Sequence, residues 1–305
     1  MLMLAVRIEK FGPPSELKLR EIATPEPGPD EILVRVSAAA INPSDVKNVA
    51  GRFHQTTLPR TPGRDFAGVV VSTGARIWAT GGELGYARDG AHAEYVAVHR
   101  DAIRPKPAAL NMEQAASAGT PYLTAWLCLT SAEVKPDEIV LVIGSGGAVG
   151  SAASQIARWK GAHVIGADRS DDANINTTKS DLKEQVMALT GGRGVDIVVD
   201  TVGGPMFEPG LDCLALHGRQ TAITSTGGSR VSFDLIEFCH KSARLIGVDS
   251  LKIGMREAGA ILDELARGFE EGALSPPLVE THPLPDAVAA YQAAEQGGKH
   301  VLTVS

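Results

Sequence analysis

Cysteine is scarce in this sequence. The 305 residues include three cysteines, Cys128, Cys213 and Cys239, in three separate regions. An odd and scattered set provides no disulfide framework, and without a Cys-x-x-Cys pair it provides no cysteine metal site. We expect all three to be buried and to pack as small hydrophobic side chains.

An excess of basic charge and long apolar runs are also lacking. The net charge of −7 and the pI near 5.6 argue against binding to nucleic acid or to an anionic membrane surface. No apolar run reaches the length of a membrane span, and residues 1–7 are too short, and lack the cleavage pattern, for a signal peptide. These absences favour a globular protein of the reducing cytoplasm.

The first hundred residues have the pattern of short strands. Alternation of apolar and polar residues is clear at 32–36, and the proline-rich residues 24–30 are typical of a turn. This pattern predicts an antiparallel, barrel-like module. Strands are expected at residues 3–8, 17–21, 31–39, 66–71 and 92–98.

From about Asn111 the pattern changes to helices and then to strands that alternate with helices. This alternation predicts a parallel, doubly wound sheet. A β-type segment at 299–304 suggests that the end of the chain returns to the first module. Helices are expected at 112–118, 122–130, 179–190, 257–271 and 285–296, and strands at 139–143, 162–167, 195–202, 219–224 and 243–248.

A glycine-rich turn after residues 139–143 is the most informative segment. The five apolar residues before it are typical of a buried parallel strand, and a helix of small residues follows. In this context glycines let the backbone approach a diphosphate, and the free N–H groups at the helix start favour an anion. We therefore predict a dinucleotide site formed by Gly144, Ser145, Gly146, Gly147, Ala148, Val149 and Gly150.

The residues after the second strand leave the choice between NADH and NADPH open. Asp168 ends that strand, 18 residues beyond Gly150. This is near the spacing expected for an acid that binds the ribose 2′-hydroxyl of NADH. Arg169 beside it could instead pair with the 2′-phosphate of NADPH.

Segments along nearly the whole chain resemble the medium-chain dehydrogenase/reductase superfamily, in particular its zinc-free quinone oxidoreductase branch. Each match is modest alone, and the order of the matches carries the resemblance. They are residues 27–36, 42–47, 62–68 and 115–125, the glycine turn, and residues 191–204 and 298–302.

The resemblance implies an α/β protein with a GroES-like antiparallel β-barrel domain and a Rossmann domain. The barrel domain would comprise residues 1–118 and 252–305, the Rossmann domain residues 119–251, and the active site the cleft between them. The activity implied is hydride transfer from NADPH to a small hydrophobic quinone or α,β-unsaturated carbonyl. Members of this superfamily join sheets edge to edge between subunits, which implies a homodimer.

The residue types argue against a catalytic zinc. Zinc-dependent members carry a cysteine where this chain has residues 42–45, and Gly-His-Glu where it has Gly63-Arg64-Asp65. A catalytic zinc needs about three cysteine, histidine or carboxylate ligands. Neither cysteine nor histidine stands at these places, and the four-cysteine structural zinc lobe is absent as well. Asp45 and Asp65 are interpreted as solvated or hydrogen-bonded acids, and we predict no metal site.

Without a metal, polar side chains must position the cofactor and the acceptor. The resemblance implies that Asn42 lies beside the nicotinamide, where its amide can donate or accept hydrogen bonds; the alternative is a turn residue before Pro43. Ser225 and Thr226 follow a predicted strand, where ligands bind in open α/β sheets. The resemblance also places Thr124, Val202, Gly203, Lys299 and Val301 near the cofactor.

The source of the proton for the product is open. Relatives often carry a tyrosine where this chain has Phe53, which can stack or exclude water but cannot donate a proton. Tyr122 and His54 are the possible substitutes, and quinone reduction could take its proton from water. We expect the loops near Phe53, His54, Tyr86 and Leu251 to shape the substrate pocket.

Two segments, near residues 73–75 and 173–174, are shorter than in relatives of this branch. Either the protein is trimmed there, or residues are missing from the sequence as written. Two functions besides quinone or enone reduction stay open. One is a zinc-free enoyl-thioester reductase, which a basic pocket made by Arg52, Arg60 and Arg64 would favour. The other is a dinucleotide-binding protein with a structural or regulatory role and little turnover.

Overall fold

The computed structural model describes residues 1–304, and contacts divide them into two compact units. Unit 1 comprises residues 1–123 and the chain from Ser250 onward, and unit 2 comprises Thr124–Asp249. None of the described helices has the length and hydropathy that a membrane crossing requires.

Unit 1 is built on a seven-stranded sheet of order β14-β15-β3-β4-β5-β7, in which β6 also pairs with β3. The long strand β3 has Val34 and Val36 fully buried against Phe66 of β4 and Val98 of β6, because its alternating pattern turns one face to the core. A separate hairpin joins β1 and β2. The strands are β1 Leu2–Arg7, β2 Lys18–Ala23, β3 Glu31–Ile41, β4 Asp65–Val70, β5 Arg76–Ala79, β6 Tyr95–His99, β7 Arg104–Pro105, β14 Glu280–Pro283 and β15 His300–Thr303.

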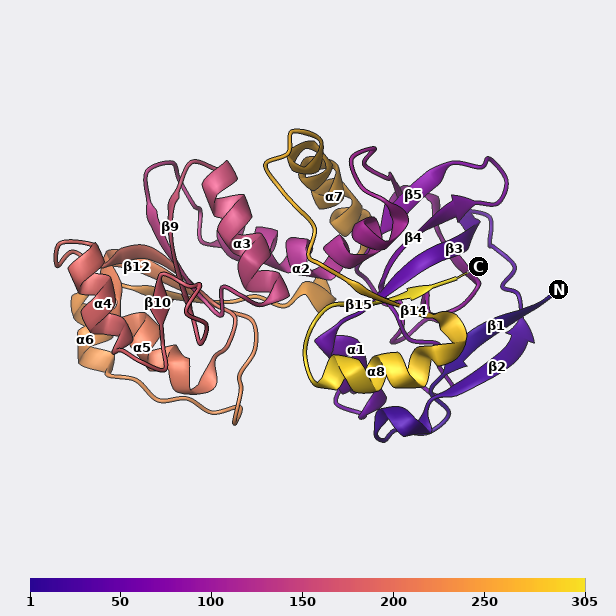
Figure 1. The fold of residues 1–305 in the computed structure, drawn as a ribbon, viewed down its shortest axis with the longest axis horizontal. Helices are drawn as coiled ribbons and strands as arrows, with labels where there is room; N and C mark the ends of the chain where they lie inside the picture. Colours follow the sequence, from indigo (N-terminus) through magenta and orange to yellow (C-terminus); the bar gives the residue numbers. More distant parts are fainter. Residues whose placement is uncertain (305) are drawn as a thin grey trace. The chain divides into compact units, whose positions relative to one another are not determined.

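The end of the chain completes the sheet of unit 1. Strand β15 pairs antiparallel with β3, so the predicted return of the C-terminal segment to the first module is confirmed. Helix α8 (Ala287–Glu295) lies beside β15 and packs against α1 (Pro43–Val49), as Figure 1 shows. Helix α7 (Met255–Glu270) contacts β5 and β7. The chain therefore brings residues near position 300 next to residues near position 40.

Helix α2 (Met112–Ser131) is continuous, so the prediction of two helices with a break at 119–121 was wrong. Pro121 lies inside it and has no N–H to donate, which normally disrupts a helix. The N–H of Thr120 donates to Oδ2 of Asp65 at 2.7 Å. The Asp65 side chain, from β4, thus accepts the N–H next to the proline, and the helix continues past Pro121.

Unit 2 is a six-stranded parallel sheet of order β10-β9-β8-β11-β12-β13. The chain starts at β8 in the middle and builds outward on both sides, which is the doubly wound order of a dinucleotide-binding fold. Helix α3 packs beside β8 and β9, and Figure 1 shows it next to β9. The predicted fold class is confirmed. The elements are β8 Ile139–Ile143, α3 Ala148–Trp159, β9 His163–Asp168, β10 Ile175–Asn176, α4 Leu182–Leu189, β11 Val195–Asp200, α5 Phe207–Asp212, β12 Leu214–Ala222, α6 Leu235–His240 and β13 Arg244–Gly247.

The two short segments close as tight connections. Between β4 and β5, the N–H of Gly74 donates to the carbonyl of Val70 at 2.8 Å. Between β9 and β10, residues 169–174 replace a crossover helix, and the side chain of Asn174 accepts from the N–H of Gly166 at 2.8 Å. A parallel crossover normally takes a dozen or more residues, and the shorter link suffices here because β10 has only two residues. The sequence as written is thus compatible with a continuous fold at both places.

The cysteines differ in their surroundings. Cys128 and Cys213 are buried as predicted, and burial raises the pKa of each thiol to about 12. Cys239 is exposed, so the prediction that all three are buried was wrong. It lies on α6, a short helix that buries none of its residues.

Candidate functional site

The glycine turn between β8 and α3 has a backbone conformation that requires glycine at two positions. Gly144 has φ +79°, which L side chains rarely adopt. A Cβ atom at Gly150 would lie 2.1 Å from the carbonyl oxygen of Gly144. The turn therefore brings the backbone close to the first turn of a 12-residue helix. Free N–H groups at such a helix start are suited to an anion such as a diphosphate.

Asp168 at the end of β9 is bound to this turn. Its Oδ2 accepts from the N–H of Gly146 at 2.7 Å, and its Oδ1 accepts from the N–H of Arg169 at 2.6 Å. Arg169 is exposed, and among residues 1–304 we find no partner for its guanidinium. The structure thus brings both residues beside the turn, one held by backbone amides and one free to meet an anion.

The carboxyl ends of β11 and β12 bring together further residues of the predicted set. The buried Asp200 accepts from the N–H groups of Val202 at 2.9 Å and Gly203 at 2.8 Å. Burial is the main cause that raises the pKa of Asp200, and these hydrogen bonds oppose it. The N–H of Thr226 donates to the carbonyl of Val202 at 3.0 Å, and the neighbouring hydroxyl of Ser225 donates to the carbonyl of Gly228. These residues form one continuous rim at the strand ends of unit 2.

In unit 1, five buried polar residues form a connected set, which we call the Asp65 group. The carboxylate of Asp65 accepts from Nδ2 of Asn42 at 2.9 Å and from the hydroxyls of two threonines at 2.5 and 2.7 Å. Nζ of Lys299 donates to Oδ1 of Asn42 at 2.6 Å. The members are Asn42, Asp65, Thr80, Thr120 and Lys299.

Asn42 combines a helix-start position with a fixed side-chain amide. It precedes α1, and its N–H donates to the Asp45 carboxylate at 2.8 Å, as a helix-start residue does. Its side-chain amide is also fixed, because Oδ1 faces the Lys299 ammonium and Nδ2 faces the Asp65 carboxylate. Burial is the main cause that lowers the pKa of Lys299, and the carboxylates of Asp65 and Asp45 act in the opposite direction.

The Asp65 group does not fit a catalytic zinc. Its amide, carboxylate, hydroxyl and ammonium groups include neither cysteine nor histidine, whereas catalytic zinc is held by three such ligands or carboxylates. The Asp65 carboxylate already accepts four hydrogen bonds, and the Lys299 ammonium next to Asn42 would repel a divalent cation. The positive charge in this group thus comes from the Lys299 side chain.

A second buried polar layer lies beside this group. Arg64 is 1% exposed, donates to Oγ of Ser44 at 3.3 Å, and lies over the Tyr86 ring at 5.6 Å. Its Nε and one terminal nitrogen have no hydrogen-bond partner. The hydroxyl of Tyr291 lies 2.9 Å from Nδ1 of His92, whose Nε2 lies 3.1 Å from the Ala40 carbonyl. Since a carbonyl only accepts, Nε2 of His92 carries the proton.

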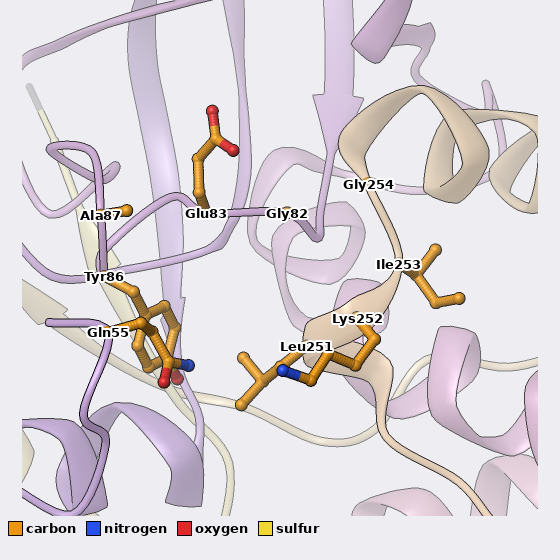
Figure 2. A pocket seen from close by; sticks show the side chains of 9 residues that line it. All are labelled: Gln55, Gly82, Glu83, Tyr86, Ala87, Leu251, Lys252, Ile253 and Gly254. Carbon is orange, nitrogen blue, oxygen red and sulfur yellow. The ribbon is translucent and has the colours of Figure 1, made fainter.

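A cavity of about 300 Å³ opens in unit 1 beside Tyr86 (Figure 2). Tyr86 and Leu251 line it, and in Figure 2 Leu251 and Lys252 extend toward Tyr86 and Gln55, whereas Glu83 points away from them. The volume is at the lower end of the range for small-ligand sites. The remaining lining residues are Gly82, Ala87, Ile253 and Gly254.

Phe53 and Tyr122, the two aromatic residues considered at the reaction site, support the structure around these sites. Phe53 packs edge to face on Tyr86 with ring centroids 5.2 Å apart, so it stands behind a wall of the cavity. Tyr122 is 1% exposed, its ring packs on Phe269, and its hydroxyl donates to the carbonyl of Ser275. This environment is that of a core tyrosine and does not favour Tyr122 as a proton donor.

Other predicted residues occupy ordinary positions in their elements. Thr124 is buried in α2, and Val301 is buried in β15 opposite Ala40 of β3. His54 is exposed and is not among the residues that line the cavity. The prediction missed Thr80 and Thr120 as partners of Asp65. Thr80 follows β5 and Thr120 lies in α2, and neither position carries a local signal of a distant carboxylate.

Comparison with known proteins gives matches over almost the whole chain. The family description "Alcohol dehydrogenase GroES-like domain" matches residues 28–108, and "Zinc-binding dehydrogenase" matches residues 148–266. A zinc-type alcohol dehydrogenase-like protein of Schizosaccharomyces pombe is 37% identical over 100% of this chain and 98% of its own length. A quinone oxidoreductase of Sus scrofa is 31% identical over 95% of this chain and 93% of its own.

Solved structures agree with these matches. The crystal structure of Escherichia coli quinone oxidoreductase complexed with NADPH superposes with a TM-score of 0.85 at 27% identity. The superposition covers 98% of this chain and 99% of the other chain.

Proposed function

The chain belongs to the medium-chain dehydrogenase/reductase superfamily of NAD(P)-dependent oxidoreductases, and on this basis we propose that it reduces a quinone or an α,β-unsaturated carbonyl without zinc. The observation that supports the proposal is the Asp65 group, which contains an ammonium and an amide and includes neither cysteine nor histidine. The quinone oxidoreductases among the relatives support the choice of acceptor.

Lys299 and Asn42 have the hydrogen-bonding capacity that the reaction needs. An ammonium has three donors, of which Lys299 uses one toward Asn42. The amide of Asn42 has a second N–H besides the one given to Asp65. We propose that these remaining donors bind the acceptor oxygen or the nicotinamide carboxamide, and that they stabilise the negative charge that develops on the oxygen during hydride transfer.

The nicotinamide supplies the hydride when it is bound, and the residues of unit 2 hold its phosphates and ribose. We propose that the glycine turn binds the diphosphate, with Val202, Gly203, Ser225 and Thr226 along the nicotinamide side. We propose NADPH as the preferred cofactor, because backbone amides already hold Asp168 whereas Arg169 is free. A quinone takes one hydride and one proton, and we propose water as the source of the proton.

Two features weigh against the enoyl-thioester alternative. Arg60 pairs with Asp89 at 3.2 Å, and Arg64 is buried, so only Arg52 of the three arginines is left to bind the phosphates of such a substrate. Phe53 stands where the relatives that motivated this alternative carry a tyrosine, and it cannot donate a proton.

The test is oxidation of NADPH and NADH by the purified protein with 1,2-naphthoquinone and with a 2-alkenal, before and after dialysis against a strong chelator. We expect turnover that dialysis leaves unchanged. Loss of turnover on chelation with recovery on zinc addition would overturn the zinc-free proposal. Tight nucleotide binding without turnover of any acceptor would favour a binding protein with a structural or regulatory role.

We also propose a homodimer formed through the outer strand β13 of unit 2. This strand ends the sheet, and an unpaired edge is a ready partner for a second copy. Leu235 and Ile236 on α6 are each 61% exposed, and Leu245 on β13 is 42% exposed. Light scattering coupled to size-exclusion chromatography should give twice the 31.9 kDa chain mass, and a monomer at micromolar concentration would contradict the proposal.

A further inference from the structure

We propose that Glu280, His282 and His300 in unit 1 bind a zinc-class divalent cation, at a site separate from the Asp65 group. The three residues lie on the adjacent parallel strands β14 and β15, with Glu280 opposite His300 in the register. Their potential metal-ligand atoms lie within 4.8 Å of one another.

The ligand atoms already have the spacing of a metal site. Nε2 of His282 lies 3.0 Å from Nδ1 of His300 and 3.5 Å from Oε1 of Glu280. Nδ1 of His300 lies 3.8 Å from Oε2 of Glu280. Ligands at about 2.0–2.1 Å from a tetrahedral zinc are about 3.3 Å apart. Small adjustments of these side chains would therefore place all three atoms around one ion.

The tautomer of His300 is set for coordination. Its Nε2 lies 2.9 Å from the carbonyl oxygen of Gly297, which can only accept, so Nε2 carries the ring proton. Nδ1 then presents a lone pair toward His282. Histidine ligands of metals usually donate their other ring N–H to a carbonyl or a carboxylate in this way. Without a metal, Nε2–H of His282 donates to Nδ1 of His300. For metal binding the proton of His282 moves to its Nδ1, so that Nε2 also presents a lone pair to the ion.

Ligand type and exposure favour zinc over the harder cations. Two imidazoles and one carboxylate suit zinc and its neighbours, whereas calcium and magnesium take oxygen ligands. The side chains of His282 and His300 are 16% and 5% exposed, and that of Glu280 is 67% exposed. The site therefore has a buried side made by nitrogen and an open side where water can complete the coordination.

The site would connect the edge of the sheet to the Asp65 group. Strand β14 is the outer strand, and β15 joins it to β3. Lys299, which binds Asn42, directly precedes His300. A bound ion would link β14 to β15 and hold the segment that carries Lys299. We expect a structural cation, and the zinc-free reduction proposed above does not depend on it.

The test uses the untagged, full-length protein in a Cys239→Ser background, because the exposed thiol could bind metal by itself. Zinc binding is measured by competition with a chromophoric chelator, and cobalt binding by its visible absorption bands. We expect one equivalent per chain with tetrahedral-type bands and a higher Tm with metal. Absence of one-to-one binding at micromolar metal would overturn the proposal.

Variants distinguish a built site from adventitious binding. Glu280→Gln and His282→Gln change side chains that reach solvent, so they should fold, and circular dichroism checks this. Each should weaken zinc binding by at least about tenfold, as the loss of even a supporting residue around a metal does. The matched control His163→Gln alters an exposed histidine of unit 2 and should leave the affinity unchanged. Unchanged affinity in His282→Gln would refute the site.

Discussion

The glycine turn of unit 2 and the Asp65 group of unit 1 are built from different parts of the polypeptide. The turn is one segment of seven consecutive residues, in which residues 144–147 donate their N–H groups within the protein and residues 148–150 begin α3. Its glycines are required because the backbone passes so close to itself. The Asp65 group offers side chains from residues 42, 65, 80, 120 and 299, which only the fold brings together. A backbone site therefore depends on the shape of one segment, and a side-chain site depends on the integrity of a whole sheet.

Replacing Lys299 by methionine should have the largest effect. The change removes the buried ammonium and leaves Oδ1 of Asn42 without its donor. We expect kcat to fall about 100-fold to 1000-fold, the range for loss of a donor to a developing negative charge. Nucleotide affinity, measured by quenching of protein fluorescence, should change less than about threefold, since the turn in unit 2 is untouched.

The matched control for this variant is Lys18→Met, which removes an exposed ammonium on β2 and should leave kcat unchanged. Equal losses in the two variants, or a collapse of nucleotide binding in Lys299→Met, would remove the contrast between the two sites.

Adding one methyl group to the glycine turn of unit 2 should impair the use of the nucleotide. In Gly150→Ala the new Cβ would lie 2.1 Å from the carbonyl oxygen of Gly144, so the backbone must move. We expect kcat/KM for the nucleotide to fall about 100-fold, as misplacement by about 1 Å can do. Gly247→Ala, where a Cβ meets nothing within 4 Å, serves as the control and should keep wild-type affinity.

Removing one hydroxyl from the Asp65 group should lower stability more than nucleotide binding. Thr120→Val deletes the 2.7 Å hydrogen bond to Oδ1 of the buried Asp65 carboxylate. We expect the free energy of unfolding to fall by about 1.5–3 kcal/mol, the range for a hydrogen bond to a charged group. Urea denaturation gives the value. Thr130→Val, which removes a hydroxyl from the surface of the same helix, should cost much less.

The smallest effect is expected at the surface of unit 2. Arg169→Ala removes an exposed guanidinium that we place against the 2′-phosphate of NADPH. We expect the KM for NADPH to rise up to about fivefold, because an exposed ion pair contributes up to about 1 kcal/mol. The KM for NADH should stay constant. A parallel rise for both nucleotides would show that Arg169 does not distinguish them.

The sequence predicted unit 2 better than the details of unit 1, because the features of unit 2 lie close together along the chain. The turn, its helix and Asp168 are consecutive or nearly so, and each carries a local pattern. The partners of Asp65 come from separate elements, with Thr80 directly after β5 and Thr120 in α2. The continuity of α2 through Pro121 depends on one of those contacts. The short strands β10 and β14 were missed because two to four residues contain no detectable period.

The resemblance to a family supplied what local patterns could not. It pointed to Asn42 and Lys299, which the structure joins directly. Tyr122 was considered only as a substitute for the missing tyrosine, and its hydroxyl donates to the carbonyl of Ser275 in the core. The histidines of β14 and β15 were not singled out, because residues 282 and 300 are neighbours only through strand pairing.

The exposed thiol of Cys239 on α6 provides a site for selective chemical labelling. Cys128 and Cys213 stay protonated and shielded near neutral pH, so a maleimide reagent should modify Cys239 alone. One fluorophore per chain can then be attached without engineering. Because α6 precedes the outer strand of the sheet, such a dye would report directly on whether two chains meet there.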